Sequence, residues 1–202
     1  MKKFSKIVVL GFLINLVISA ISPNSIAFTC SAEVICTEPN NQLFPYICSD
    51  DEGSAFITWS DNRSGLGYDI YAQKVNVNGN KEWGTGGIGI YTTEGDQRVS
   101  KICSDGSGGA IITWLNDSNS FIFAQRISAS GNLLWNASGV LISTIGFVLG
   151  ICSDKYGGAI IAWDYLDDFY AQRISSNGTI MWDNDGVVIC NATYTQENLG
   201  FY

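Results

Sequence analysis

The stretch from Ile102 to Trp114 reads ICSDGSGGAIITW, and the chain repeats it almost unchanged in two other places. Residues 47–59 read ICSDDEGSAFITW, and residues 151–163 read ICSDKYGGAIIAW. The copies therefore begin 102 − 47 = 55 and 151 − 102 = 49 residues apart. Such a period indicates an array in which each repeat is one small unit that buries its faces against its neighbours.

Each copy continues beyond the shared Trp with a further set of recurring residues. An Ala-Gln-Lys or Ala-Gln-Arg segment is followed at fixed spacing by a second Trp and then by a Gly. These residues are Gln73, Gln125 and Gln172; Lys74, Arg126 and Arg173; Trp83, Trp135 and Trp182; and Gly87, Gly139 and Gly186. Short β-prone runs between turns rich in Gly and Asp predict four strands per copy, and no segment has helical periodicity.

The run from Ala110 to Trp114 is apolar on both of its alternating faces. A strand of this kind fits a sheet that lies between two other sheets, as a propeller blade does. We therefore predict an all-β fold, a partial β-propeller of three four-stranded blades plus a stray N-terminal strand. The expected divisions are a signal peptide at 1–27, the stray strand and a linker at 28–46, blades at 47–101, 102–150 and 151–190, and a C-terminal tail at 191–202.

The repeated pattern resembles that of secreted bacterial and archaeal β-propeller repeat arrays. It is similar in layout to the seven-bladed propeller repeats, and the resemblance covers about residues 31–190. The matching letters are S-D-x-x-G-G-A-I-I-x-W, then D-I-Y-A-Q-R, and then the spaced Gly, Trp and Gly. The resemblance implies an extracellular binding or scaffold module and carries no implied activity.

The first 27 residues predict export. Lys2, Lys3 and Lys6 precede a mostly apolar run, and Ser25-Ile26-Ala27 places small residues where a signal peptidase cleaves. The run is short for a membrane span, so we expect a secreted or cell-surface protein with no membrane span after cleavage. Without its leader the chain has a formal charge of 8 − 19 = −11, which disfavours nucleic acid as a partner. The absence of His excludes Ser-His-Asp catalysis and imidazole zinc sites.

Three blades are too few for a closed ring, since propellers typically have at least four. Residues 33–37 resemble the closing strand of a missing blade, because Val188-Ile-Cys190 ends the third copy in the same way. Three explanations stay open. The chain is a fragment of a longer array, two or more copies join as a homo-oligomer that completes the ring, or the stray strand caps an open arc.

Residues that recur in every copy are expected to be structural, so the loops unique to one copy hold the candidate binding residues. Asp61 and Arg63 lie in the long loop of the first copy, where Arg63 could bind a carboxylate or sugar hydroxyls. The alternative is a structural turn. Asp164 and Asp168, with Asp167 between them, offer oxygen ligands of the kind that calcium takes. The alternative there is a solvated acidic turn, and no metal or other cofactor is otherwise indicated.

Six cysteines follow the leader. Cys48, Cys103 and Cys152 occupy equivalent positions, which predicts small buried core residues rather than partners of one another. A bridge from Cys36 to Cys48, or from Cys30 to Cys36, is an alternative in an oxidising compartment.

These observations do not indicate an enzyme. They favour a non-catalytic extracellular propeller that binds or scaffolds an extracellular protein or glycan. The alternative is a carbohydrate-active or glycan-binding propeller resembling a glycoside hydrolase. Such an enzyme needs two carboxyl groups about 5–9.5 Å apart, and the sequence gives no reason to pair any two.

Overall fold

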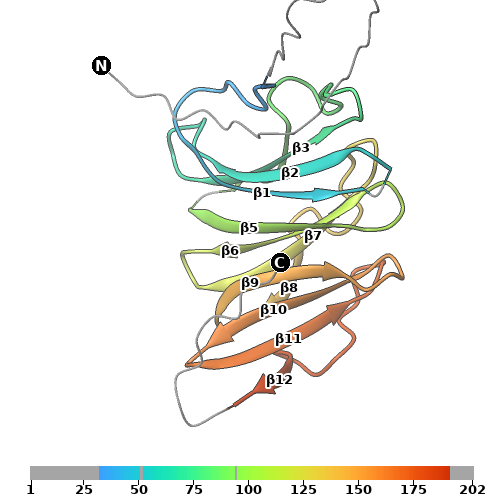
Figure 1. Cartoon of the computed structure of the whole chain (residues 1–202). Helices are drawn as coiled ribbons and strands as arrows, with labels where there is room; N and C mark the ends of the chain where they lie inside the picture. Colours follow the sequence, from blue (N-terminus) through green and yellow to red (C-terminus); the bar gives the residue numbers. More distant parts are fainter. Residues whose placement is uncertain (1–31, 51, 94, 192–202) are drawn as a thin grey trace, which may run out of the picture.

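The computed structural model describes residues 32–50, 52–93 and 95–191, and this part of the chain is all-β without a helix. Twelve strands form three four-stranded antiparallel sheets, and in each sheet the strands follow chain order (Figure 1). Blade 1 contains β1 (Gln42–Ser49), β2 (Ala55–Asp61), β3 (Asp69–Val75) and β4 (Ile88–Tyr91). Blade 2 contains β5 (Gln97–Ser104), β6 (Ala110–Asn116), β7 (Phe121–Ile127) and β8 (Val140–Ser143). Blade 3 contains β9 (Phe147–Ser153), β10 (Ala159–Tyr165), β11 (Asp168–Ile174) and β12 (Val187–Cys190).

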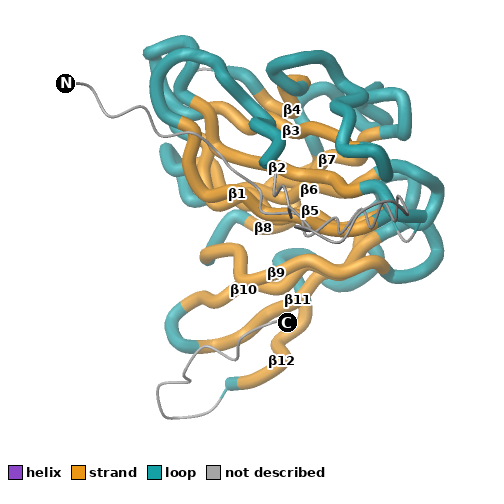
Figure 2. The backbone as a smooth tube through the Cα atoms, turned by 45° about the horizontal axis from the view of Figure 1, so that its top comes forward, coloured by secondary structure: helices purple, strands orange, loops and turns teal. Residues whose placement is uncertain are grey.

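The three blades stack face to face in sequence order (Figures 1 and 2). The first strands lie side by side, β1 next to β5 and β5 next to β9. This arrangement confirms the predicted partial propeller of three four-stranded blades. The shared Ile-Cys-Ser-Asp begins inside the first strand of each sheet rather than at its start, since the sheets begin at Gln42, Gln97 and Phe147.

Two apolar layers lie between the blades. Ile112 and Trp114 on β6 point into the layer shared with blade 1, and Ile111 and Leu115 point into the layer shared with blade 3. The prediction that this strand is buried on both faces is therefore correct. We call the face of each blade that carries Trp59, Trp114 or Trp163 its leading face, and the opposite face, with Ile90, Ile142 or Ile189, its trailing face. Trp114 and Trp163 lie against the blade that precedes them in the chain.

The recurring Gly before the fourth strand allows the chain to pass over the indole of this Trp. Gly139 has a positive φ of 75°. A Cβ at this position would lie 2.8 Å from Trp114 Cη2 and 3.0 Å from the carbonyl oxygen of Ala124. Only Gly satisfies both demands without strain, which explains why the residue recurs.

The recurring Gln and Asp hold turns together. Gln125 Nε2 donates to the carbonyl of Asn136 over 2.7 Å, and its Oε1 accepts from the backbone N–H of Trp135 over 3.0 Å. Gln73 and Gln172 make the equivalent bonds. Asp105 accepts backbone N–H bonds within its own turn and pairs with Arg126 Nη2 over 2.8 Å. These side chains are occupied by the scaffold, as expected of residues that recur in every blade.

The N-terminal segment differs from the expected strand. Within residues 33–37, Val34 makes an isolated β-bridge, and no strand is formed. Ile35 and Cys36 are buried instead, in a cluster with Ile57 and Trp59 on the leading face of blade 1. The segment therefore lies on this sheet face without the ladder of backbone pairing that a strand would have.

The cysteine expectations hold only in part. Cys103 is buried between blades 2 and 3, whereas its equivalent Cys152 is exposed, since no further blade covers it within the part of the chain that the structure describes. Cys36 is a buried free thiol, so the bridge to Cys48 is not formed. The expected leader, Cys30 and residues 192–202 of the tail lie outside the described residues. Within those residues there is no helix of the length and apolarity that a membrane crossing requires.

Candidate functional site

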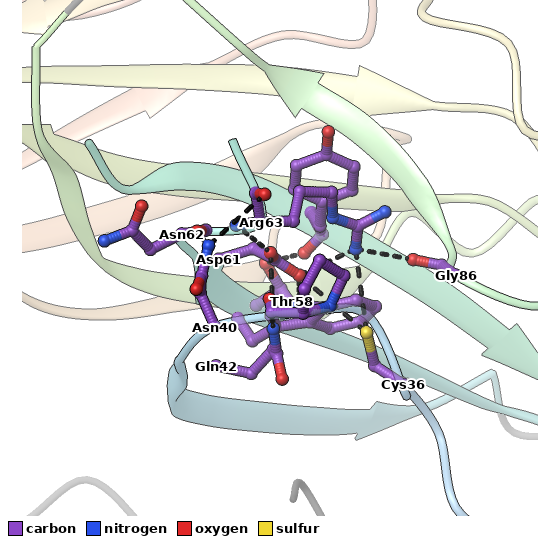
Figure 3. A network of polar contacts seen from close by, with 11 residues as sticks. Cys36, Asn40, Gln42, Thr58, Asp61, Asn62, Arg63 and Gly86 are labelled. Carbon is purple, nitrogen blue, oxygen red and sulfur yellow. Dashed lines mark hydrogen bonds and ion pairs between the residues drawn. The ribbon is translucent and has the colours of Figure 1, made fainter. Parts of the chain in front are cut away.

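Asp61 and Arg63 lie at the end of β2 and form a buried ion pair (Figure 3). Arg63 Nη2 lies 2.6 Å from Asp61 Oδ2, and the Asp61 side chain is fully buried. The same Asp61 oxygen accepts the indole N–H of Trp59 over 2.7 Å. Asp61 Oδ1 accepts the backbone N–H of Arg63 over 2.8 Å and Nε2 of Gln42 over 3.5 Å. The carboxylate therefore joins β1, β2 and the loop after β2.

The Arg63 guanidinium contacts three further parts of the chain, two in blade 1 and one in the N-terminal segment. It donates to the carbonyl of Gly86 over 2.8 Å and lies 3.6 Å above the ring of Tyr71 on β3. It also donates to Cys36 Sγ over 3.6 Å, and the Cys36 thiol in turn donates to Asp61 over 3.8 Å. The structure therefore brings the two predicted site residues together, but it engages the Arg63 guanidinium in contacts within the protein.

The electrostatics of the pair favour two charged groups. Burial alone would raise the pKa of Asp61, but hydrogen bonds from Arg63 and Trp59 outweigh it and hold the pKa below its ordinary value. Burial would lower the pKa of Arg63, and the bond to Asp61 raises it instead. Burial raises the pKa of the Cys36 thiol, which therefore keeps its proton at neutral pH.

Asp69 is a second carboxylate in this cluster, and sequence reasoning missed it. It lies directly opposite Asp61 in the register of β2 and β3 and is buried. Burial, together with the charge of Asp61, raises its pKa from 3.8 to about 6. The sequence feature that could have predicted Asp69 is an Asp at the end of one strand followed by another Asp at the start of the next. A hairpin places such residues opposite each other.

The second predicted set does not converge. Asp164 on β10 lies opposite Phe169, whereas Asp168 on β11 lies opposite Tyr165, so the two carboxylates belong to opposite faces of blade 3. Asp167 lies in the two-residue turn, with a φ of 67°. No group of three or more potential metal-ligating side chains occurs in the part of the chain that the structure describes. The geometry therefore supplies no support for calcium at these residues.

A shallow hollow lies where the loops of blades 1 and 2 meet. It has a volume of about 380 Å³ and is lined by Leu66, Gly95, Asp96, Asp117 and Ser118. Arg98 spans its two carboxylates, 2.9 Å from Asp96 and 3.1 Å from Asp117. These acids are thus already neutralised by a residue of the protein.

The two ends of the stack expose apolar side chains whose equivalents are buried at the junctions between blades. On the trailing face, Ile90 and Ile142 are 1% and 3% exposed, but the equivalent Ile189 of blade 3 is 62% exposed. On the leading face, Ile102 is 7% exposed and the equivalent Ile47 of blade 1 is 54% exposed. Large exposed apolar surfaces of this kind are typical of protein interaction sites.

Hydrogen bonds across the blade junctions show the same pattern. The indole N–H of Trp83 donates to the carbonyl of Ala129 in the next blade over 3.0 Å. Trp135 and Arg126 both donate to the carbonyl of Ser176, over 3.0 and 2.9 Å. Trp182 is the equivalent residue of blade 3. Within the described residues no blade follows it, so its indole N–H makes no such bond across a junction.

The fold defines a partial β-propeller in which both end blades carry exposed apolar side chains, Ile47 in blade 1 and Ile189 in blade 3. No protein-family model matches the chain, and a comparison with curated proteins finds no significant match. Membership of a repeat-array family therefore stays a prediction. Among solved structures, the chain is similar to a calcium-binding protein, regucalcin, from Agrobacterium tumefaciens strain C58, with 12% sequence identity and a TM-score of 0.36. The match covers 70% of this chain and 44% of regucalcin, so the chain spans less than half of that protein's length.

Proposed function

We propose that this chain is a non-catalytic, extracellular scaffold module that binds a second copy of itself end to end and so completes a propeller ring. The observation that carries the proposal is the exposure of Ile189 at a position that is buried in both other blades. Covering one such side chain contributes about 1.5–3 kcal/mol, so several must be covered together to offset the entropy cost of association.

The two open ends are complementary in kind. In both internal junctions, the first strand of the following blade packs on the preceding blade, as β5 does on β1, β2 and β3. The trailing face of blade 3 therefore fits β1 of a second copy, where Ile47 is uncovered. Two copies would supply 2 × 3 = 6 blades, a number within the usual range for closed propellers.

The internal junctions also indicate the polar contacts of this interface. Val77 stands in blade 1 where Ala129 and Ser176 stand in blades 2 and 3, and its side chain is exposed. By analogy with Trp135 and Arg126, we expect Trp182 and Arg173 to donate to the carbonyl of Val77 of the second copy. These bonds would set the register of the two copies.

An extracellular setting is supported by the basic and apolar pattern of residues 1–27. The strongly acidic remainder supports a protein partner over nucleic acid. A different extracellular protein or a glycan would compete with the second copy as the occupant of the open ends, and either one would leave the purified chain monomeric.

The test is size-exclusion chromatography with light scattering over a wide range of protein concentration. We expect a discrete two-copy species at high concentration, and monomer for Ile189→Asp, which places a charge in the interface. Leu66→Asp is the matched control, because Leu66 is also exposed but lies in the loop between β2 and β3. A wild-type chain that stays monomeric at every concentration would overturn the proposal.

A further inference from the structure

Residues 34–36 repeat the letters of β12. Val34-Ile35-Cys36 and Val188-Ile189-Cys190 are identical in sequence, although the first is an irregular segment and the second belongs to a strand. The identical residues differ sharply in environment, since Ile35 is 3% exposed and Ile189 is 62% exposed.

Ile35 takes the position that a fourth strand takes at the internal junctions. Ile90 lies in the same apolar cluster as Trp114 of the next blade, and Ile142 lies in the same cluster as Trp163. Ile35 shares a cluster with Trp59 in the same way. The neighbouring residues correspond as well. Tyr91 packs on Trp114 with ring centroids 5.3 Å apart, and Cys36, at the equivalent position, contacts the Asp61–Arg63 pair beside Trp59.

We propose that the leading face of blade 1 around Trp59 is the docking surface for β12 of a second copy, and that residues 33–37 are a built-in substitute which leaves when the ring closes. This inference rests on the proposed function and adds a regulatory step to it. The segment covers the apolar face of the monomer and delays association until the incoming strand displaces it.

The attachment of the segment suits displacement. Lys81 Nζ donates to the carbonyl of Val34 over 3.0 Å and lies 3.6 Å from the carboxylate of Glu33. The contacts of Cys36 with Asp61 and Arg63 are the long sulfur contacts of 3.8 and 3.6 Å. By contrast, β12 is paired with β11, with one irregularity between Phe169 and Tyr170, and it belongs to a complete four-stranded blade. We therefore expect the incoming blade to make more contacts with this face than the segment it replaces.

Cysteine-resolved alkylation, read by mass spectrometry on the full chain, tests the exchange directly. In the monomer, Cys36 is buried and Cys190 is exposed, so Cys190 should react much faster. On association the two should exchange, because Cys190 enters the site that Cys36 leaves. Cys103, buried between blades 2 and 3, should stay protected in both states and serves as the internal control.

Ile35→Ser loosens the segment without altering the face beneath it. We expect its dissociation constant for self-association to fall by at least about tenfold relative to wild type, since displacement no longer uncovers a buried Ile. Lys81→Met, which removes the tether to Val34 outside the apolar cluster, should act in the same direction. Thermal melts of both variants check that blade 1 stays folded. If Ile35→Ser unfolds blade 1, the self-association of Lys81→Met becomes the test of the inference.

The outcomes separate the two proposals. Association of the wild type with Cys36 still protected, or association that neither variant strengthens, would overturn the displacement and leave the scaffold function standing. No association in any variant would overturn both. Exchange of protection between Cys36 and Cys190, with stronger association of the loosened variants, supports both.

Discussion

The indole N–H of Trp59 donates a hydrogen bond to Asp61 Oδ2 over 2.7 Å, whereas the same ring nitrogen of Trp114 and of Trp163 has no partner among the described residues. The difference arises two positions further along the strand, where blades 2 and 3 have Asn116 and Tyr165 in place of Asp61. Blade 1 has no preceding blade in the structure, and its Trp is held by polar contacts instead. We call the bonded group Trp59, Asp61 and Arg63 the polar clamp.

Replacing Arg63 tests the importance of this clamp. Arg63→Gln leaves the fully buried Asp61 carboxylate without its charge partner, so we expect it to lower the free energy of unfolding by about 3–5 kcal/mol. The matched change Arg98→Gln removes two ion pairs, to Asp96 and Asp117, whose side chains are all more than one-third exposed, and should cost about 0–1 kcal/mol. Urea denaturation followed by Trp fluorescence measures both, and equal losses would show that the clamp has no special role.

The pH dependence of stability should report on Asp69. Its pKa of about 6 in the folded protein is above the ordinary 3.8, so the folded state holds the proton more tightly than the unfolded state. Stability from this group is fully present below about pH 4 and is lost as the pH rises through 6. The loss is on the order of 2–3 kcal/mol.

Comparison with Asp69→Asn isolates this contribution, because the amide does not titrate. Denaturation at a series of pH values should show the wild type losing stability relative to this variant between pH 4 and pH 7. The depressed pKa of Asp61 acts in the opposite sense, since its contribution is lost only as the pH falls below the ordinary value. Parallel pH profiles for the two proteins would contradict the assignment.

Gly139→Ala should destabilise the chain more than Gly106→Ala. Both glycines have a positive φ, which costs a residue with a side chain about 1–2 kcal/mol. At Gly106 the new Cβ meets open space, whereas at Gly139 it meets the Trp114 indole and the Ala124 carbonyl. Overpacking adds about 1–3 kcal/mol there. Thermal unfolding of the two variants decides the matter, and similar midpoints would be evidence against a tight passage over the indole.

Calcium should leave the melting temperature unchanged. Asp164 and Asp168 face opposite sides of blade 3, and calcium takes six to eight oxygen ligands gathered around one point. Differential scanning fluorimetry with calcium and with a chelator makes the comparison. A rise on calcium addition that Asp168→Asn abolishes would show that the carboxylates rearrange around an ion.

Two members of the candidate site, Asp61 and Arg63, were predictable from the sequence, but its other members and its role were not. Asp61 and Arg63 were identified because their loop is unique to one copy, and the structure does bring them together. Sequence spacing could not show that Cys36 and Gly86 close around them, since those contacts join segments distant in the chain. Asp164 and Asp168 are close in sequence, yet the alternation of side chains along strands places them on opposite faces.

The sequence by itself determined the blade: its four strands, its turns and its recurring Gln, Gly and Trp. Those features depend on contacts within one repeat or with an adjacent repeat, and repetition makes them visible. Only the tertiary structure decided which equivalent positions are covered, because burial depends on what lies beyond a face. Ile35 and Ile189 carry the same local sequence, but Ile35 packs beside Trp59, whereas Ile189 is exposed and no blade of the described chain lies against it.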